Sequence, residues 1–186
     1  ALLAAARRSA RGASQPHFVH GAYGTLPFAP GAFDAVLCLG TALGYLGDEG
    51  DRAALREFRR VLAPDGCLVL ETLHRGELGA RLGEHEERPL ARGGTLRFER
   101  QFDPVRGLMR ESQRLVDGGG GGPPRTYELR VYSADELGRM LENAGFAVIA
   151  RHASLAGEGE PSPDAPLVLV ARATSATADD GQGYPT

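Results

Sequence analysis

The stretch LREFRRVLAPDGCLVLE, residues 55–71, decides the fold class. Its apolar residues first recur at helical spacing with the arginines on the opposite face, which predicts an amphipathic helix over residues 49–62. The turn-forming residues 64–66 then end this helix, and the apolar residues 67–70 predict a buried strand. A helix followed by a tight turn and a buried strand is typical of an α/β protein.

The residues before this stretch continue the same pattern. Residues 33–39 (FDAVLCL) are continuously apolar after their second residue, as in a strand that is buried on both faces of a parallel sheet. Residues 2–8 have the spacing of the end of a helix, and residues 18–19 predict a short strand that ends at Gly21. Helices that alternate with buried strands predict a parallel sheet with crossover connections.

The pattern of apolar and polar residues changes after the second buried strand. Residues 75–92 are polar and rich in Gly, Arg and Glu, which predicts a helix or a mobile loop. Residues 95–102, 108–116 and 126–132 alternate apolar and polar side chains, as half-exposed antiparallel strands do. The glycine run 118–122 predicts a flexible hairpin tip between the last two of these strands.

The C-terminal part returns to helix and strand. Residues 133–136 (SADE) form a capping-box pattern that predicts the start of a helix, and Gly145 predicts its end. Residues 147–150 and 167–172 predict two last strands joined by a Pro-rich loop. Residues 173–186 are expected to be a disordered tail.

Composition narrows the function classes. The chain has 186 residues, enough for one globular domain with a real core. A net charge of −3 makes nucleic acid an unlikely partner, and no apolar run approaches the roughly 20 residues of a membrane span. The arginines at the N-terminus follow the apolar stretch, which is the reverse of a signal peptide. Two cysteines, Cys38 and Cys67, favour a reduced, cytoplasmic protein over a disulfide scaffold.

The absence of one residue type is also informative. All 21 basic residues are arginine, so mechanisms with an obligatory lysine are excluded, among them P-loop phosphate binding and Schiff-base chemistry. No ligand spacing for a metal is met either, because His85 stands among glutamates on a polar stretch that is most simply a solvated surface.

These segments, in this order, resemble the class I S-adenosylmethionine-dependent methyltransferases of the small-molecule type over residues 1–172. The resemblance implies a Rossmann-like α/β sheet and an antiparallel β insertion, about residues 75–132, that covers the active site. It also implies S-adenosylmethionine as cofactor and a small molecule as methyl acceptor. The segments that carry it are HFVHGAYGTLPF (17–28), FDAVLCLGTALGYL (33–46), LREFRRVLAPDGCLVLE (55–71) and SADELGRMLENAGF (133–146).

Two departures from the family's pattern stand out. The glycine turn after the first strand and the acidic residue after the second are absent, so we expect an N-terminally truncated chain that lacks about 40 to 60 residues, given ~30 for one strand–helix–strand unit. In the family pattern an aspartate that accepts a hydrogen bond from the adenine amino group stands where this chain has Ala22. The chain alone is therefore expected to bind the cofactor weakly and to be inactive.

The resemblance also predicts the sheet. The family's strand order is 3-2-1-4-5-7-6, and residues 18–21 and 33–39 correspond to the third and fourth strands. Without the first two strands, either a gap remains beside residues 33–39 or the third strand moves in to pair with them. An exposed edge of this kind favours association, so a homodimer is a candidate assembly.

The candidate cofactor-binding residues lie in two loops. The loop after the third strand corresponds to the family's adenine-contacting loop, and Tyr23 could stack on the base. The turn after the fourth strand lies at the carboxyl edge of the sheet, where open α/β sheets bind ligands, although Gly40 could serve only the backbone of the turn. The candidates are Gly21, Ala22, Tyr23, Leu39, Gly40 and Thr41.

The candidate acceptor-side residues are Tyr45, Arg130 and Tyr132. Tyr45 stands where relatives often carry an aromatic residue or His facing the substrate, and a core position is an equal alternative. Arg130 and Tyr132 share one face of the strand that enters the last helix, and a solvent face is the alternative for both. His74 follows the strand at 67–70 and is the best-placed general base, although methyl transfer needs mainly positioning.

Two functions from different classes remain open at this point. The first is methyl transfer from S-adenosylmethionine to a small molecule. The second is a non-catalytic, methyltransferase-like fragment or subunit that acts as a binding or dimerisation partner.

Overall fold

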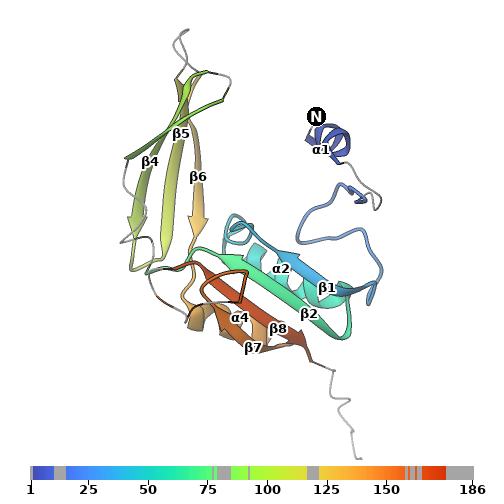
Figure 1. The fold of residues 1–186 in the computed structure, drawn as a ribbon. Coiled ribbons are helices and arrows are strands. Elements are labelled where there is room, and N and C mark those ends of the chain that lie inside the picture. Colours follow the sequence, from blue (N-terminus) through green and yellow to red (C-terminus); the bar gives the residue numbers. More distant parts are fainter. Residues whose placement is uncertain are drawn as a thin grey trace, which may run out of the picture.

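In the computed structural model the described residues form two four-stranded sheets whose strands run in different directions, and the two sheets meet near the end of strand β6 (Arg125–Arg130) (Figure 1). The structure describes residues 2–10, 16–76, 78, 85–91, 93–116, 122–157, 159, 162 and 165–174. The expected flexible tip at residues 118–121 and the expected tail from residue 175 onward lie outside these ranges.

The main sheet has the order β1-β2-β8-β7. Its strands are β1 (Phe33–Cys38), β2 (Leu62–Thr72), β7 (Phe146–His152) and β8 (Leu167–Ala173). Strands β1 and β2 are parallel, whereas β8 runs antiparallel to both of its neighbours. The order 4-5-7-6 that the resemblance implied for these four strands is confirmed.

Two helices cover one face of the main sheet, α2 (Gly47–Val61) and α4 (Ala134–Asn143) (Figure 1). Both hydrogen bonds of the expected capping box start α4 at Ser133, and Gly145, with φ of +86°, follows its end. A third helix, α1 (Leu2–Ser9), lies apart from this sheet, and none of the described helices is long and apolar enough to cross a membrane.

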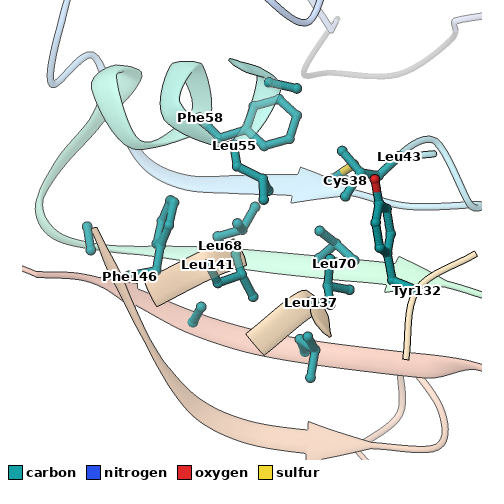
Figure 2. Close-up of a cluster of buried hydrophobic side chains, with 14 of the residues drawn as sticks. Cys38, Leu43, Leu55, Phe58, Leu68, Leu70, Tyr132, Leu137, Leu141 and Phe146 are labelled. Carbon is teal, nitrogen blue, oxygen red and sulfur yellow. The ribbon is translucent and has the colours of Figure 1, made fainter. Parts of the chain in front are cut away.

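The core of this domain lies between the sheet and the two helices (Figure 2). Leu55 and Phe58 of α2 and Leu137 and Leu141 of α4 pack over Leu68 of β2, and all five side chains are buried. The helical spacing that predicted α2 is therefore the spacing of its buried face. Burial of large apolar side chains of this kind contributes about 1.5–3 kcal/mol each, which is what fixes the helices on the sheet.

The second sheet has the order β3-β4-β5-β6 and is antiparallel throughout. Its strands are β3 (His85–Pro89), β4 (Thr95–Asp103), β5 (Leu108–Val116) and β6 (Arg125–Arg130). A small separate core of Leu78, Met109, Leu129 and Val131 fills its base. The antiparallel strands that the alternation predicted are confirmed.

Strand β3 corrects the expectation of a helix or mobile loop for residues 85–89, whereas residues 77, 79–84 and 92 of the expected stretch lie outside the described residues. Its sequence, HEERP, shows no apolar alternation because its side chains find charged partners on β4. Glu87 pairs with Arg97 at 2.6 Å and Glu86 with Arg100 at 2.8 Å. Cross-strand ion pairs of this kind take the place of an apolar face.

The expected third strand at residues 18–21 is not formed. Residues 16–20 have no strand structure, and the nearest pairing is an isolated bridge between Ala22 and Thr25. Within the described ranges nothing pairs with the outer edge of β1, so of the two expected outcomes the gap is the one found. A lone segment has no ladder partner to satisfy its backbone groups, which is why it remains without strand structure.

Strand β1 is also less buried than its sequence predicted. Cys38 points to the core, but Leu37 points to the opposite face and is 64% exposed. A continuously apolar strand indicates that both faces can be covered, and here the helices cover one of them. The expectation that residues 33–39 are buried on both faces is wrong for the structure described.

Candidate active site

The carboxyl ends of β1 and β2 meet at one edge of the main sheet, where the turn after β1 is held by Glu71. The Gly40 N–H donates to the Glu71 carboxylate at 2.9 Å, and the Thr41 N–H donates to the Glu71 carbonyl at 3.3 Å. Gly40 and Thr41 both have positive φ, of 68° and 56°. No atom lies within 4 Å of a Cβ built on Gly40, so a ligand can approach this backbone closely.

The same loop is fixed further along by Asp51, a residue that the sequence analysis missed. Asp51 lies on α2 with no exposed surface, and its carboxylate accepts the Gly44 N–H at 3.1 Å. The other carboxylate oxygen accepts the Tyr132 hydroxyl at 2.8 Å. One signal could have revealed it, because Asp51 falls at helical spacing with Leu55 and Phe58 on the apolar face of α2.

The expected adenine-contacting loop is tied to α2 by a polar clip, formed by Glu57 and Arg60. The Leu26 N–H donates to Glu57 at 3.2 Å, and Arg60 donates to the Leu26 carbonyl at 3.1 Å. Tyr23 meets Phe58 edge to face, with ring centroids 6.0 Å apart. Partial burial raises the pKa of the Tyr23 phenol, which stays neutral at physiological pH. Sequence reasoning missed this clip, although Glu57 and Arg60 have the spacing of a helical ion pair.

The start of this loop is a tight turn. A Cβ on Gly21 would lie 2.9 Å from Pro27, so the glycine is needed for close approach rather than for a positive φ. Ala22 and Thr25 bridge across the turn, and Ala22 is exposed. Its methyl group offers no hydrogen-bond acceptor, as the sequence indicated.

Tyr45 connects the loop after β1 to the antiparallel sheet. It is half-exposed, and its ring lies 5.5 Å from that of Tyr127 on β6, at an angle of 57°. The Tyr127 hydroxyl donates to Glu111, whose buried carboxylate pairs with Arg100. Burial alone would raise the pKa of Glu111, but hydrogen bonds from Gln113, Tyr127 and Arg100 hold it below its usual range. Tyr45 thus lies at the junction of the two sheets and is not a core residue.

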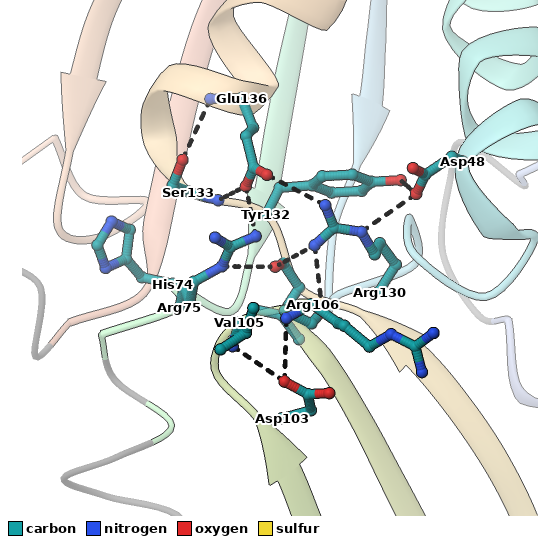
Figure 3. A network of polar contacts seen from close by, with 12 residues as sticks. Asp48, His74, Arg75, Asp103, Val105, Arg106, Arg130, Tyr132, Ser133 and Glu136 are labelled. Atoms are coloured by element: carbon teal, nitrogen blue, oxygen red, sulfur yellow. Dashed lines mark hydrogen bonds and ion pairs between the residues drawn. The ribbon is translucent and has the colours of Figure 1, made fainter.

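Arg130 and Tyr132 contact each other rather than solvent (Figure 3). The Arg130 guanidinium carbon lies 4.8 Å from the centre of the Tyr132 ring, and that ring is buried. Arg130 also binds Asp48 and Glu136, each at 3.1 Å. Burial and the hydrogen bond to Asp51 raise the pKa of Tyr132. The alternative of a solvent face is therefore wrong for Tyr132, whereas Arg130 is partly exposed, and both residues line a cavity of about 300 Å³ between α2 and α4.

A clamp of charged groups holds the base of the antiparallel sheet against α4, and we use "the clamp" for Arg75, Arg130 and Glu136 (Figure 3). Arg75 pairs with Glu136 at 2.6 Å, and both arginines donate to the Val131 carbonyl. Burial opposes ionisation of Glu136, but hydrogen bonds from the Ser133 N–H, Arg130 and Arg75 lower its pKa to about 2. Gly107 lies beside the clamp with φ of +61°, and a Cβ there would lie 2.3 Å from Arg130.

His74 lies on the far side of Arg75 from Arg130 and Tyr132 (Figure 3). Its Nδ1 accepts the Gly76 N–H at 3.3 Å. The structure therefore does not bring His74 together with the acceptor-side candidates. In the part of the chain that is described, no three His, Cys, Asp or Glu side chains are grouped so as to hold a metal ion.

Comparisons of the sequence and of the structure with known proteins both find methyltransferases. Residues 1–66 match the sequence model of a family described as a methyltransferase domain. The solved structure of the CcbJ methyltransferase from Streptomyces caelestis superposes with a TM-score of 0.71 at 23% identity, covering 84% of this chain and 63% of that one. The chain has the fold of the class I methyltransferases. No curated protein matches it in sequence.

Two further structures share this methyltransferase fold. An S-adenosylmethionine-dependent methyltransferase from Clostridium acetobutylicum superposes with a TM-score of 0.71 at 14% identity, covering 87% of this chain and 66% of that one. The sugar N-methyltransferase KedS8 from Streptoalloteichus gives 0.61 at 20% identity, covering 83% and 61%. The chain thus spans less than two thirds of each of the three methyltransferases, between 61% and 66%.

Proposed function

We propose that this chain is part of an enzyme that transfers a methyl group from S-adenosylmethionine to a small molecule. The observation that carries the proposal is that the methyltransferase-domain match, residues 1–66, includes both the loop around Tyr23 and the turn at the carboxyl end of β1. In this position S-adenosylmethionine supplies an electrophilic methyl group. The acceptor atom would supply the electron pair for the new bond to the methyl group, the sulfur would keep the pair of the broken bond in S-adenosylhomocysteine, and the acceptor's proton would pass to solvent or to a base.

The residues present fit two parts of this cofactor. The open space beside Gly40 admits the methionine end, with Leu39 and Thr41 on either side of it in the chain. Tyr23 is 39% exposed and keeps a ring surface for the adenine base. The sequence holds no Gly-x-Gly-x-Gly turn that leads from a strand into a helix, because the glycine run 118–122 lies between the strands β5 and β6, and Ala22 supplies no acceptor. Residues 1–186 alone are therefore proposed to bind the cofactor weakly and to be inactive by themselves.

The acceptor is proposed to bind beside the contact of Tyr45 with Tyr127, where the loop after β1 meets the antiparallel sheet. This sheet would exclude water from the reacting sulfur. For Arg130 and Tyr132 we propose an acceptor-side role through position, because their polar atoms are already bound by Asp48, Glu136 and Asp51. That His74 serves as a general base stays a prediction.

The nature of the acceptor rests on the neighbours alone. KedS8 is described as a sugar N-methyltransferase, and we propose a small polar acceptor of similar kind for this chain. We propose a cytoplasmic location, which the two free cysteines, Cys38 and Cys67, support. The exposed edge of β1 is the proposed place of contact in a homodimer.

A titration of residues 1–186 with S-adenosylhomocysteine, followed by NMR, tests the proposal. We expect weak binding that perturbs the amide signals of Tyr23, Gly40 and Thr41 and leaves those of the antiparallel sheet tip unchanged. Ala22→Asp is expected to strengthen binding, because the new carboxylate can accept the adenine amino group. No perturbation at millimolar ligand would contradict the proposed function and favour the non-catalytic alternative, and micromolar affinity would contradict the weak binding.

A further inference from the structure

Asp51 is a buried carboxylate that the proposed reaction does not use. It has no exposed surface, and no arginine or histidine of the described ranges forms an ion pair with it. The donors that replace its hydration are the Gly44 N–H and the Tyr132 hydroxyl, at 3.1 and 2.8 Å. Because a buried charge is costly when a donor is lost, both contacts are expected to be strongly maintained.

These two donors belong to different parts of the molecule. Gly44 lies in the loop that follows β1, four residues after Gly40. Tyr132 lies in the segment that leaves β6 of the antiparallel sheet and enters α4. One carboxylate on α2 therefore holds the candidate cofactor loop with one oxygen and the exit of the acceptor-side sheet with the other.

A second link closes this arrangement into a ring. The Arg130 N–H donates to the Gly44 carbonyl at 2.8 Å, so both backbone polar groups of Gly44 serve the junction. A Cβ on Gly44, where φ is +113°, would lie 2.4 Å from the Arg130 carbonyl and 2.6 Å from Leu129. The loop and the end of β6 are thus in direct contact, with no room for a side chain between them.

We propose that Asp51 is a positioning residue that couples the loop of residues 39–46 to the antiparallel sheet. A change in the loop on ligand binding then reaches the sheet through the Asp51 carboxylate, and the reverse holds as well. The coupling rests on contacts within this chain, whereas its effect on methyl transfer rests on the proposed function.

Hydrogen exchange of the whole chain, followed by mass spectrometry, tests the coupling. Tyr132→Phe removes one donor and leaves the ring in place, so amides of residues 39–46 are expected to exchange about tenfold faster or more, relative to amides of β7 and β8. Asp51→Asn keeps an acceptor and can donate to the Tyr132 oxygen. In this variant the amides of residues 39–46 are therefore expected to keep part of the protection from exchange that Tyr132→Phe loses. Glu49→Gln removes a charge from an exposed pair on the same turn of α2 and is the matched control.

The double variant and the pattern of exchange across the chain distinguish coupling from a merely structural hydrogen bond. If the two changes act through one contact, the double variant with Asp51→Asn and Tyr132→Phe has less than the sum of the single effects. Exchange that rises equally everywhere in Tyr132→Phe, or unchanged exchange in residues 39–46, would overturn the coupling and leave a merely structural hydrogen bond. Should methyl transfer be absent altogether, the exchange result still stands. Where transfer occurs, Tyr132→Phe is expected to lower kcat more than it raises the KM for the cofactor.

Discussion

The ring of Tyr45 lies against the ring of Tyr127, with centroids 5.5 Å apart and planes at 57°, and this pair joins the loop after β1 to the antiparallel sheet. Tyr45→Ala removes the contact and is expected to lower the free energy of unfolding by about 0.5–1.5 kcal/mol. Tyr45→Phe keeps the ring and is expected to change it little. Urea unfolding followed by circular dichroism measures both, with Val105→Ala, at a fully exposed turn, as control. Equal losses for the Phe and Ala variants would show that the hydroxyl, and not the ring, makes the contact.

Arg130 is expected to be needed for its shape as well as its charge. Arg130→Ala removes contacts to Asp48, Glu136 and the Gly107 carbonyl, and we expect a loss of about 1–3 kcal/mol in the free energy of unfolding. Arg130→Lys is expected to recover little, because an ammonium cannot reach all three partners as the guanidinium fork does.

The matched control for Arg130 is Arg110→Ala. The pair of Arg110 with Glu128 is solvent-exposed on both sides and is expected to contribute less than about 1 kcal/mol. A similar loss for Arg110→Ala and Arg130→Ala in the same denaturation series would refute a special role for the clamp.

Glu136 makes the stability depend on pH in a defined window. Its pKa in the folded chain is about 2, below the ordinary value of 4.5, so the unfolded chain binds its proton first. The stabilisation from ionised Glu136 is therefore complete above pH 4.5 and is lost as the pH falls toward 2. Glu136→Gln is expected to flatten the decline of the melting temperature between pH 5 and 2. Glu142→Gln, an exposed glutamate on the same helix, is expected to leave that decline unchanged.

The clip of Glu57 and Arg60 is expected to control the order of the loop around Tyr23. Arg60→Ala frees the carbonyls of Leu26 and Phe28 and is expected to speed cleavage of this loop by proteases. If the proposed function holds, the same variant binds S-adenosylhomocysteine more weakly. Arg56→Ala, an exposed arginine on the same helix, serves as control. An unchanged cleavage rate in Arg60→Ala would show that the loop is held by its own turn.

Elements whose signals are local could be predicted from the sequence. The buried face of α2 and the capping box at Ser133 depend on residues within a few positions, and both are found as expected. The third strand and the burial of Leu37 could not be predicted, because a strand depends on the neighbours that pair with it and cover it. Strand β3 could not be predicted for a related reason, because the residues that pair with its charged side chains lie on β4.

In the candidate site too, some features could be predicted from nearby residues and others depend on partners that are distant in the sequence. The turn at Gly40 and the exposed Tyr45 lie at the carboxyl edge, where strand order alone places them. Sequence reasoning brought Arg130 and Tyr132 together through strand alternation, but it could not show that Asp48 and Asp51 occupy their polar atoms. Those acids are far away in the chain, and only the packing of α2 brings them near.

The chain leaves the main sheet for the antiparallel sheet, and returns from it, at neighbouring positions. Leu73, where the chain leaves the main sheet, packs against the small core that contains Val131, where the chain returns. The sheet has its own small core and is fastened by the clamp rather than by the strands of the main sheet. A segment with adjacent ends can be lengthened, recombined or replaced while β1, β2 and the helices behind them keep their packing. If the proposed function holds, acceptor preference can change within this sheet while the proposed cofactor loops keep their structure.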